Sequence, residues 1–259
     1  MPVKEFSEEF VPDAPAPHPQ GEFPFHKPCV SQNENQFVSV PTHLFMHTRS
    51  GPPKITAIRD SGLCPDLEFK NTTSLPSKIL RNKPDISVIS CSPNQDSASG
   101  QKWEFRWGTV ELWIKNKWKG DDPFIQIEEL QRNPEASCHV NWTNSAYKTC
   151  RQLVDYAAYH HCSQFRVFSF SVAVIEDTFR LLRWDRSGIV YTAPSNLADG
   201  YLFDFLWRFD HLSPADRGYD PTICPADDDE AELALPKLRT YPKFENVRKE
   251  HLHRILVWA

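Results

Sequence analysis

Five polar residues in the middle of the chain have types and spacing that could carry chemistry. They are Asp85, Glu111, Lys115, Gln152 and Tyr156. Asp85 follows a proline and opens one predicted strand, whereas Glu111 and Lys115 share a face of the next strand. Gln152 and Tyr156 are four residues apart on a predicted helix, so they also share a face. Each residue has a structural interpretation too: the aspartate caps a turn, the glutamate is an exposed strand residue, and the helix pair packs on a surface.

The order of these elements, strand, strand, helix and strand, resembles the core of the PD-(D/E)XK nucleases. In that superfamily an aspartate and a glutamate hold a divalent metal, which activates water and stabilises the phosphate. The resemblance therefore implies that Asp85 and Glu111 bind Mg²⁺ or Mn²⁺. Gln152 and Tyr156 form a Gln-x-x-x-Tyr pair similar to that of the RecB-like branch.

The expected lysine of the nuclease motif is displaced. That lysine should follow Glu111 by two residues, where this sequence has Trp113. Lys115 lies two residues further along on the same face, about 7 Å beyond the expected position by strand rise. In the nucleases this cation lies near the attacking water and the scissile phosphate. A nuclease therefore requires Lys115 to reach back along its strand.

The elements that position these residues are predicted from hydrophobic periodicity. Strands are predicted at 86–90, around 110–114, and at 165–175, 178–184 and 189–192, and helices at 144–164 and 202–209. The longer helix starts at Asn144 or Ser145 as its N-cap. Its predicted buried face contains Ala146, Cys150, Leu153, Val154, Ala157 and His161. The fold class is α/β: a mixed sheet of about four to six strands flanked by helices. The nuclease resemblance implies that this sheet forms a restriction-endonuclease-like core.

Short motifs in the second half of the chain suggest a family. The most specific are Trp-Asp-Arg-Ser-Gly at 184–188 and Gly-Tyr-Asp-Pro-Thr at 218–222, with Phe-Leu-Trp-Arg-Phe at 205–209 between them. Over roughly residues 80–225 the chain is similar to the fungal-type protein kinase family, in the region that precedes the kinase lobes. The resemblance implies that residues 36–223 form a nuclease-like N-terminal domain of that family.

The catalytic motifs of a kinase are missing from this sequence. There is no Gly-x-Gly-x-x-Gly loop, and His253-Arg254 is followed by Ile255 rather than aspartate. Asp185 lies in a predicted hairpin turn and does not belong to a kinase catalytic loop. The resemblance thus implies a short or truncated family member without phosphotransferase activity.

The two ends of the chain differ in composition from its middle. Residues 1–35 are predicted to be a flexible proline-rich leader, because their prolines disfavour helix and inner strand. Residues 224–259 are predicted to be an acidic loop and a C-terminal tail, and the run Asp227–Glu230 is expected to be a solvated loop. Both termini are therefore expected to be disordered.

Composition limits the classes of function and location. The net charge of −5 argues against a general nucleic-acid coat, which would need a basic face. The N-terminus lacks the apolar run of an export signal, and no stretch approaches the ~20 apolar residues of a membrane span. The seven cysteines contain no Cys-x-x-Cys pair and are expected to be reduced thiols. We expect an intracellular protein, cytoplasmic or nuclear, without membrane association.

Two further groups of residues were considered as sites. His160, His161 and Cys162, together with Cys138 and His139, could bind a metal, but a buried structural histidine is the plainer expectation. Four tryptophans beside three lysines could stack bases, but sheet packing explains the aromatic residues equally well. They are Trp103, Trp107, Trp113 and Trp118, beside Lys115, Lys117 and Lys119.

Three functional hypotheses follow. The first is a non-catalytic module that acts through protein contacts or binds a phosphate-bearing ligand, without a cofactor. The second is a metal-dependent nuclease that uses Asp85 and Glu111 as ligands, Lys115 as the cation and nucleic acid as substrate. The third is an accessory fragment that binds a separate kinase lobe, which an exposed apolar patch near residues 201–223 would favour.

Overall fold

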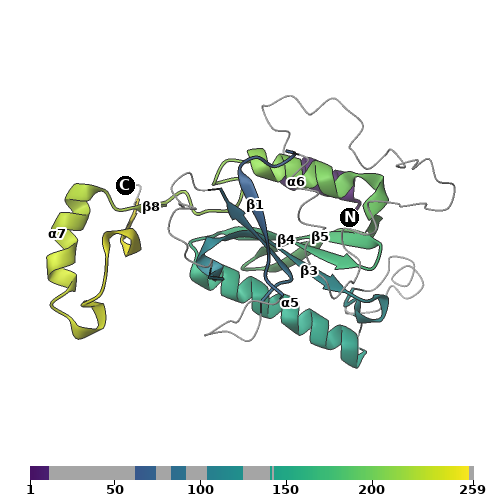
Figure 1. The fold of residues 1–259 in the computed structure, drawn as a ribbon, viewed down its shortest axis with the longest axis horizontal. Coiled ribbons are helices and arrows are strands. Elements are labelled where there is room, and N and C mark those ends of the chain that lie inside the picture. The colour runs from purple at the N-terminus through teal and green to yellow at the C-terminus, as the bar shows by residue number, and fades with distance from the viewer. Residues whose placement is uncertain (12–61, 74–82, 92–103, 125–140, 142, 257–259) are drawn as a thin grey trace, which may run out of the picture. The chain divides into compact units, whose positions relative to one another are not determined.

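The computed structural model describes residues 1–11, 62–73, 83–91, 104–124, 141 and 143–256, in two compact units, Met1–Gly218 and Tyr219–Ala259. The first unit is a mixed sheet with helices on both faces (Figure 1). Its strands are β1 (Leu67–Asn71), β2 (Ile86–Ser90), β3 (Val110–Lys117), β4 (Phe168–Ile175), β5 (Thr178–Asp185), β6 (Gly188–Tyr191) and β7 (Ser195–Asn196). Its α-helices are α1 (Val3–Phe10), α5 (Asn144–Ser163) and α6 (Tyr201–His211).

The strands lie in the order β1-β2-β3-β4-β5-β6, and β7 pairs with β5. Every neighbouring pair is antiparallel except β3 and β4, which run parallel. A parallel pair needs a crossover connection, and α5 provides it between β3 and β4. The prediction of an α/β fold with a mixed sheet and flanking helices is therefore confirmed.

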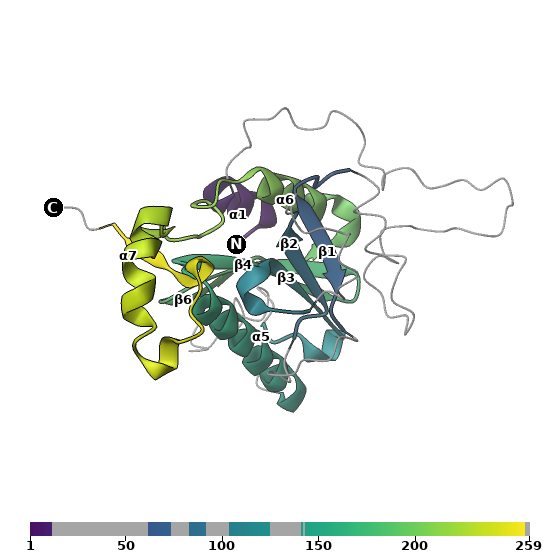
Figure 2. The same cartoon turned by 60° about the vertical axis from the view of Figure 1, so that its left-hand side comes forward.

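The helices form two layers on either side of the sheet. Helix α5 covers one face, and α1 and α6 cover the other (Figures 1 and 2). Because side chains alternate along a strand, Leu112 and Ile114 of β3 pack on the side of α6, whereas Trp113 packs on the side of α5. The sheet is thus buried on both faces around β3 and β4.

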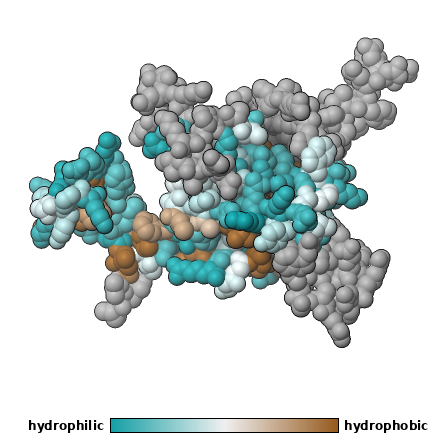
Figure 3. Space-filling view, turned by 90° about the horizontal axis from the view of Figure 1, so that it is seen from below, coloured by the Kyte–Doolittle hydropathy of each residue, from teal (hydrophilic) through white to brown (hydrophobic). Residues whose placement is uncertain are grey.

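The surface of the molecule is more polar than these two interior layers. Figure 3 views the side on which α5 lies, and the described surface there is mostly hydrophilic, with smaller hydrophobic areas. No helix in the described part of the chain is long and apolar enough to cross a membrane.

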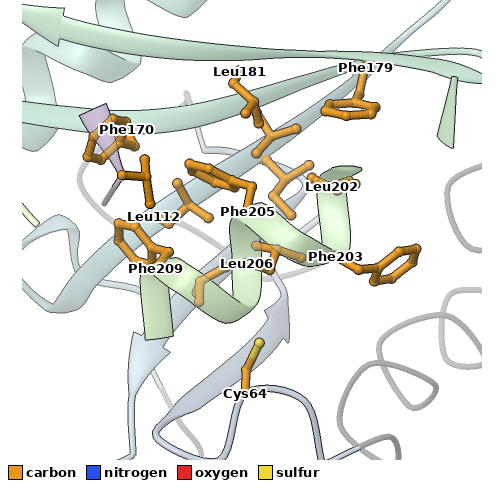
Figure 4. Close-up of a cluster of buried hydrophobic side chains, with 14 of the residues drawn as sticks. Cys64, Leu112, Phe170, Phe179, Leu181, Leu202, Phe203, Phe205, Leu206 and Phe209 are labelled. Carbon is orange, nitrogen blue, oxygen red and sulfur yellow. The ribbon is translucent and has the colours of Figure 1, made fainter. Parts of the chain in front are cut away.

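The core beneath α6 is built from aliphatic and phenylalanine side chains. Phe205 and Phe209 of α6 lie against Phe170 of β4, with ring centroids 6.0 Å apart in both pairs (Figure 4). Aromatic rings that meet edge to face in this way contribute beyond their buried area. Packing of these apolar side chains therefore holds α6 against this face of the sheet.

Helix α5 occupies the predicted residues, but its cap and its buried face differ. Thr143, rather than Asn144 or Ser145, is the N-cap, and its hydroxyl accepts a hydrogen bond from the backbone N–H of Ala146. The buried residues are Ala146, Thr149, Leu153, Tyr156, Ala157 and His160. Val154 was expected to be buried but is 49% exposed. The apolar count misplaced this face because Tyr156 and His160 bury their rings. The Tyr156 hydroxyl and Nε2 of His160 have hydrogen-bond partners, whereas Nδ1 of His160 is buried without one among the described residues.

The prediction of a flexible leader is wrong for residues 3–10. They form α1, an amphipathic helix in which Val3 and Phe6 are buried. The Phe6 ring meets Phe170 of β4 with centroids 6.2 Å apart, and burial of such a side chain contributes about 1.5–3 kcal/mol. The remainder of the predicted leader lies outside the described residues, from position 12 onward.

Strand β4 begins at Phe168, three residues later than predicted. The preceding residues are held by a loop instead of a neighbouring strand: the N–H of Val167 donates to the carbonyl oxygen of Gly218 at 2.9 Å. Gly218 has φ +97°, and a Cβ there would lie 2.0 Å from the carbonyl oxygen of Phe168. The glycine of the 218–222 motif is therefore required by the backbone.

The second unit contains an ordered structure where a loop and a tail were predicted. It comprises β8 (Ile223–Pro225), α7 (Asp228–Leu238) and β9 (His253–Ile255), and β8 pairs with β9. The prediction that the acidic run forms a solvated loop is wrong, because Asp227 is the N-cap of α7 and the rest of the run lies in its first turn. Its carboxylate accepts from the N–H of Glu230, and the Glu230 side chain accepts from the N–H of Asp227.

Candidate functional site

An ion pair between Asp85 and Lys115 lies where β2 and β3 meet. Ile86 is paired with Ile114 in the antiparallel register, so Asp85 falls opposite Lys115. The Nζ of Lys115 donates to Oδ1 of Asp85 at 2.9 Å. The two side chains are only 12% and 15% exposed, so the pair is shielded but reachable from solvent.

Backbone groups of β3 and of Thr72, the residue that follows β1, fix Asp85 in place. Its Oδ2 accepts a hydrogen bond from the N–H of Asn116 at 2.7 Å, and its own N–H donates to the carbonyl oxygen of Ile114 at 3.2 Å. On the other side, the N–H of Thr72 donates to the Asp85 carbonyl oxygen at 2.9 Å. Thus both carboxylate oxygens already have donors, and the aspartate has little freedom to move.

Helix α5 brings two more of the predicted residues to this site. The hydroxyl of Tyr156 donates to the carbonyl oxygen of Lys83 at 2.5 Å and accepts from Nε2 of Gln152 at 2.8 Å. The Nζ of Lys115 lies 5.9 Å from the centre of the Tyr156 ring. Burial, with the negative charge of Asp85 as a second cause, raises the pKa of Tyr156 well above its usual value. The phenol therefore stays neutral and anchors the chain just before Asp85.

Two more lysines lie near Asp85 along the chain, and the carboxylate of Asp121 is close enough to act on one of them, Lys117. Besides Lys115, the site has Lys83 two residues before the aspartate and Lys117 two residues after Lys115. Partial burial lowers the pKa of Lys117, and the neighbouring Lys115 lowers it further, whereas Asp121 and Asp85 raise it. Partial burial also lowers the pKa of Lys83. The charges of Lys115 and Lys117 therefore interact with each other as well as with Asp85.

Glu111 is not part of this site. It lies four residues before Lys115, about 13 Å away along the strand. Its Oε2 accepts from Nη2 of Arg166 at 2.8 Å, and its Oε1 accepts from the hydroxyl of Ser90 at 2.9 Å. The predicted metal pair of Asp85 and Glu111 is therefore not brought together, because the antiparallel register sets the two carboxylates at different places along β3.

Trp113 occupies the position two residues before Lys115. It is fully buried and meets the Tyr156 ring edge-on, with centroids 5.4 Å apart, and Trp184 at 6.2 Å. An indole cannot ligate Mg²⁺, which prefers oxygen ligands. Within the described ranges no three His, Cys, Asp or Glu side chains come together as a possible metal site. The residues present around Asp85 thus do not fit a two-carboxylate metal centre.

The buried ends of α5 and β3 carry a second polar cluster, which has a structural role. Arg166 has a fully buried side chain that donates to Glu111 and to the carbonyl oxygen of Arg217. Nε2 of His160 lies 2.6 Å from the carbonyl oxygen of Val110 and must donate to it. Burial, with the positive charge of Arg166 as a second cause, lowers the pKa of His160 to about 3, so the ring is neutral.

The two alternative sites considered from the sequence are only partly described. Cys138, His139 and Trp103 lie outside the described residues. Trp107 is buried in the interior beneath α5, as Trp113 is, whereas Trp118 is 56% exposed.

Sequence reasoning missed two contributors to the Asp85 site. The carbonyl oxygen of Lys83 and the N–H of Asn116 are backbone groups, and no pattern of side-chain types reveals which of them will meet a buried hydroxyl or carboxylate. The sequence signal that did point to this site was Lys115, which is the side-chain partner of Asp85. The sequence allowed Lys115 to lie opposite Asp85 on an antiparallel neighbouring strand. It could not show that it does, because this depends on the register in which β2 and β3 pair.

Comparisons of the chain with protein-family models, with curated proteins and with solved structures found no match. The function is therefore argued from the geometry of the Asp85 site.

Proposed function

We propose that this chain carries a non-catalytic, nuclease-like module that binds a phosphate-bearing ligand at Asp85, Lys115 and Lys117. The observation that carries the proposal is the ion pair between Asp85 and Lys115, which has Lys117 near it and in which both oxygens of Asp85 already accept hydrogen bonds. The ligand would meet the ammonium groups, which act as point charges towards phosphate. Asp85 would hold Lys115 in position rather than bind a metal.

The topology supports a restriction-endonuclease-like core. Strands β1, β2 and β3 form an antiparallel series, α5 follows, and β4 then pairs parallel to β3. Asp85 opens the second strand, Lys115 lies on the third, and the Gln152–Tyr156 pair lies on the helix. This is the order that the nuclease resemblance implies.

The loss of the second carboxylate supports binding without catalysis. In the nuclease motif the residue two positions before the lysine is acidic, and relative to Lys115 this residue is Trp113. Trp113 is part of the interior packing beneath α5. Both oxygens of Asp85 are also occupied by donors. A metal-activated water would need ligands that this arrangement does not offer.

We retain the fungal-type protein kinase family as part of this proposal. Its most specific motifs have structural uses here: Oδ1 of Asp185 accepts from the N–H groups of Ser187 and Gly188 in a hairpin turn, and Gly218 has a left-handed backbone. Such uses suit a module that precedes kinase lobes without being a kinase. A kinase lobe or another protein would then be the partner, and Tyr201, 43% exposed, lies in the region expected to contact it.

One observation favours the alternative of a metal-dependent nuclease. Relative to Asp85, Lys115 is not displaced at all, because the two side chains are in contact across the strand pair. A nuclease would then need a second acidic ligand from another part of the chain. Mg²⁺ or Mn²⁺ and nucleic acid belong to this alternative only.

Titration with inorganic pyrophosphate tests the proposal. Binding to the full chain would be followed by calorimetry and by amide chemical shifts, with the Lys115→Ala and Lys117→Ala variants and with Lys4→Ala as a control. Lys4 is an exposed residue of α1, on the opposite face of the sheet. We expect each site variant to weaken binding by roughly tenfold, since one charged contact contributes about 1.5–3 kcal/mol, and the control to bind like wild type. Equal affinity in all four proteins, or no binding in any, would contradict the proposal.

A further inference from the structure

A buried carboxyl group lies at the other end of β1 from the Asp85 site. Asp210 of α6 is 2% exposed, and its Oδ1 accepts a hydrogen bond from the N–H of Asp66 at 3.2 Å. Its Oδ2 is buried and has no hydrogen-bond partner among the described residues. A buried carboxyl group with an unpartnered oxygen destabilises the fold strongly when it is charged and much less when it is protonated.

The neighbouring cations do not neutralise this oxygen. His211 Nδ1 lies 3.8 Å from Oδ2 of Asp210, but it donates its hydrogen to the carbonyl oxygen of Trp207 at 2.8 Å. The guanidinium group of Arg217 donates to the carbonyl oxygens of Phe209 and Asp210, and not to the carboxylate. The closest partners therefore satisfy backbone acceptors.

The acidic groups around Asp210 disfavour its charged form. Burial, followed by the negative charge of Asp66, raises the pKa of Asp210 to about 6, although His211, Arg217 and the hydrogen bond from the Asp66 N–H lower it in part. Burial also raises the pKa values of the Cys64 and Cys91 thiols, and Asp210 adds to this effect for both. Cys64 points towards α6 (Figure 4). The thiols thus stay neutral in mildly acidic solution, in which the Asp210 carboxyl group titrates.

We propose that Asp210 is a pH-sensitive clasp that fixes the start of β1 to α6 when its carboxyl group is protonated and loosens this edge when the group is charged. The Asp66 N–H joins the clasp to the turn before β1, and the carbonyl oxygen of Asp66 accepts from the N–H of Cys91 at 2.8 Å, which joins it to the end of β2. At the far end of β1, Thr72 holds the backbone of Asp85. The clasp therefore acts on β1 and β2, and Asp85 of the candidate site lies at the far end of this strand pair.

The direction of the effect follows from linkage. The pKa of Asp210 in the folded protein is higher than the usual value, so the stabilisation is full below about pH 4 and is lost as the pH rises through about 6. Between these values the opening equilibrium of this edge should rise by up to about tenfold per pH unit, and above them it should be constant.

Hydrogen exchange of the full chain tests the clasp. Protection of residues 62–71, corrected for the intrinsic pH dependence of exchange, would be measured between about pH 4 and pH 8. Asp210→Asn mimics the protonated group, and Asp204→Asn is the matched control, a partly exposed carboxylate of the same helix paired with Arg208. We expect wild type and the control to lose protection by ten- to a hundred-fold through the window, and Asp210→Asn to stay protected. A wild-type profile without this loss, or an Asp210→Asn profile that still has it, would overturn the proposal.

A second variant keeps the test decisive if Asp210→Asn does not fold. Asp66→Asn removes the negative charge that raises the pKa of Asp210 but leaves the donating N–H in place. The transition should then move to lower pH. An unchanged midpoint would show that the loss of protection comes from another group.

Discussion

Asp85 lies opposite Lys115 across the β2–β3 pairing, and their side chains meet at 2.9 Å. The pairing therefore brings Asp85 into contact with Lys115, whereas Glu111 lies elsewhere along β3 and pairs with Arg166. Two residues before Lys115, where the nuclease motif has an acidic metal ligand, this chain has Trp113, which is buried in the interior. From this arrangement we infer a site that binds and does not cleave.

Removal of Glu111 should affect stability and not ligand binding. Glu111→Ala would leave Arg166 buried without its carboxylate partner, at a cost of about 3–5 kcal/mol in unfolding free energy. Urea denaturation would measure this loss, and a pyrophosphate titration below the denaturation midpoint would measure affinity. We expect the folded variant to bind pyrophosphate with wild-type affinity. A loss of affinity in fully folded protein would return Glu111 to the site.

Removal of the Tyr156 hydroxyl should loosen the segment before Asp85. In Tyr156→Phe the carbonyl oxygen of Lys83 loses its donor, which should cost about 1–2 kcal/mol of unfolding free energy. Gln152→Ala removes only a donor to that hydroxyl and should cost less. Denaturation of both variants under the same conditions gives the ranking, and a reversed ranking would mean that the Tyr156–Lys83 contact is not the important one.

Gly218→Ala should be strongly destabilising. The new Cβ would lie 2.0 Å from the carbonyl oxygen of Phe168, at a residue with φ +97°, so we expect a loss of more than about 2 kcal/mol. Gly120→Ala is the control, because no atom lies within 4 Å of its added Cβ; it should change stability by less than about 0.5 kcal/mol. Thermal unfolding of both variants would decide, and similar midpoints would contradict this packing of the Gly218 loop.

His160 should make the protein sensitive to acid. Its pKa is depressed to about 3 in the folded state by burial, so its contribution is present above the ordinary histidine pKa of about 6.5 and is lost as the pH falls towards 3. The Asp210 effect has the opposite sign between about pH 4 and 6. His160→Gln should therefore flatten the acid side of a stability–pH profile, whereas exposed His253→Gln should not. Identical acid limbs in both variants would exclude His160 as the cause.

Local patterns predicted many of the elements from residue 86 onward. The alternation in 86–90 and the hairpin turn at 185–188 depend on neighbouring residues alone, and the structure has both elements at these places. The long helix was also predicted within one residue. Such segments have strong periodicity, which local sequence is sufficient to reveal.

The parts that sequence could not provide depend on long-range contacts. Helix α1 was missed because eight residues beside a proline-rich stretch become helical only when Phe6 packs on Phe170. The separation of Glu111 from Asp85 depends on a register, and it includes an irregularity between Val88 and Ile89 that no local pattern reveals. Of the five polar residues that the sequence singled out, four come together, and Glu111 does not. The four are Asp85, Lys115, Gln152 and Tyr156.

A cleavage assay tests the central claim most directly. The purified full chain would be incubated with labelled single- and double-stranded DNA and RNA in the presence of Mg²⁺ or Mn²⁺, beside the Asp85→Ala variant. We expect no cleavage above that of the variant, from a sample that is folded and binds pyrophosphate through Lys115 and Lys117. Metal-dependent cleavage that disappears in Asp85→Ala would contradict the account and would make Asp85 a catalytic residue of a nuclease.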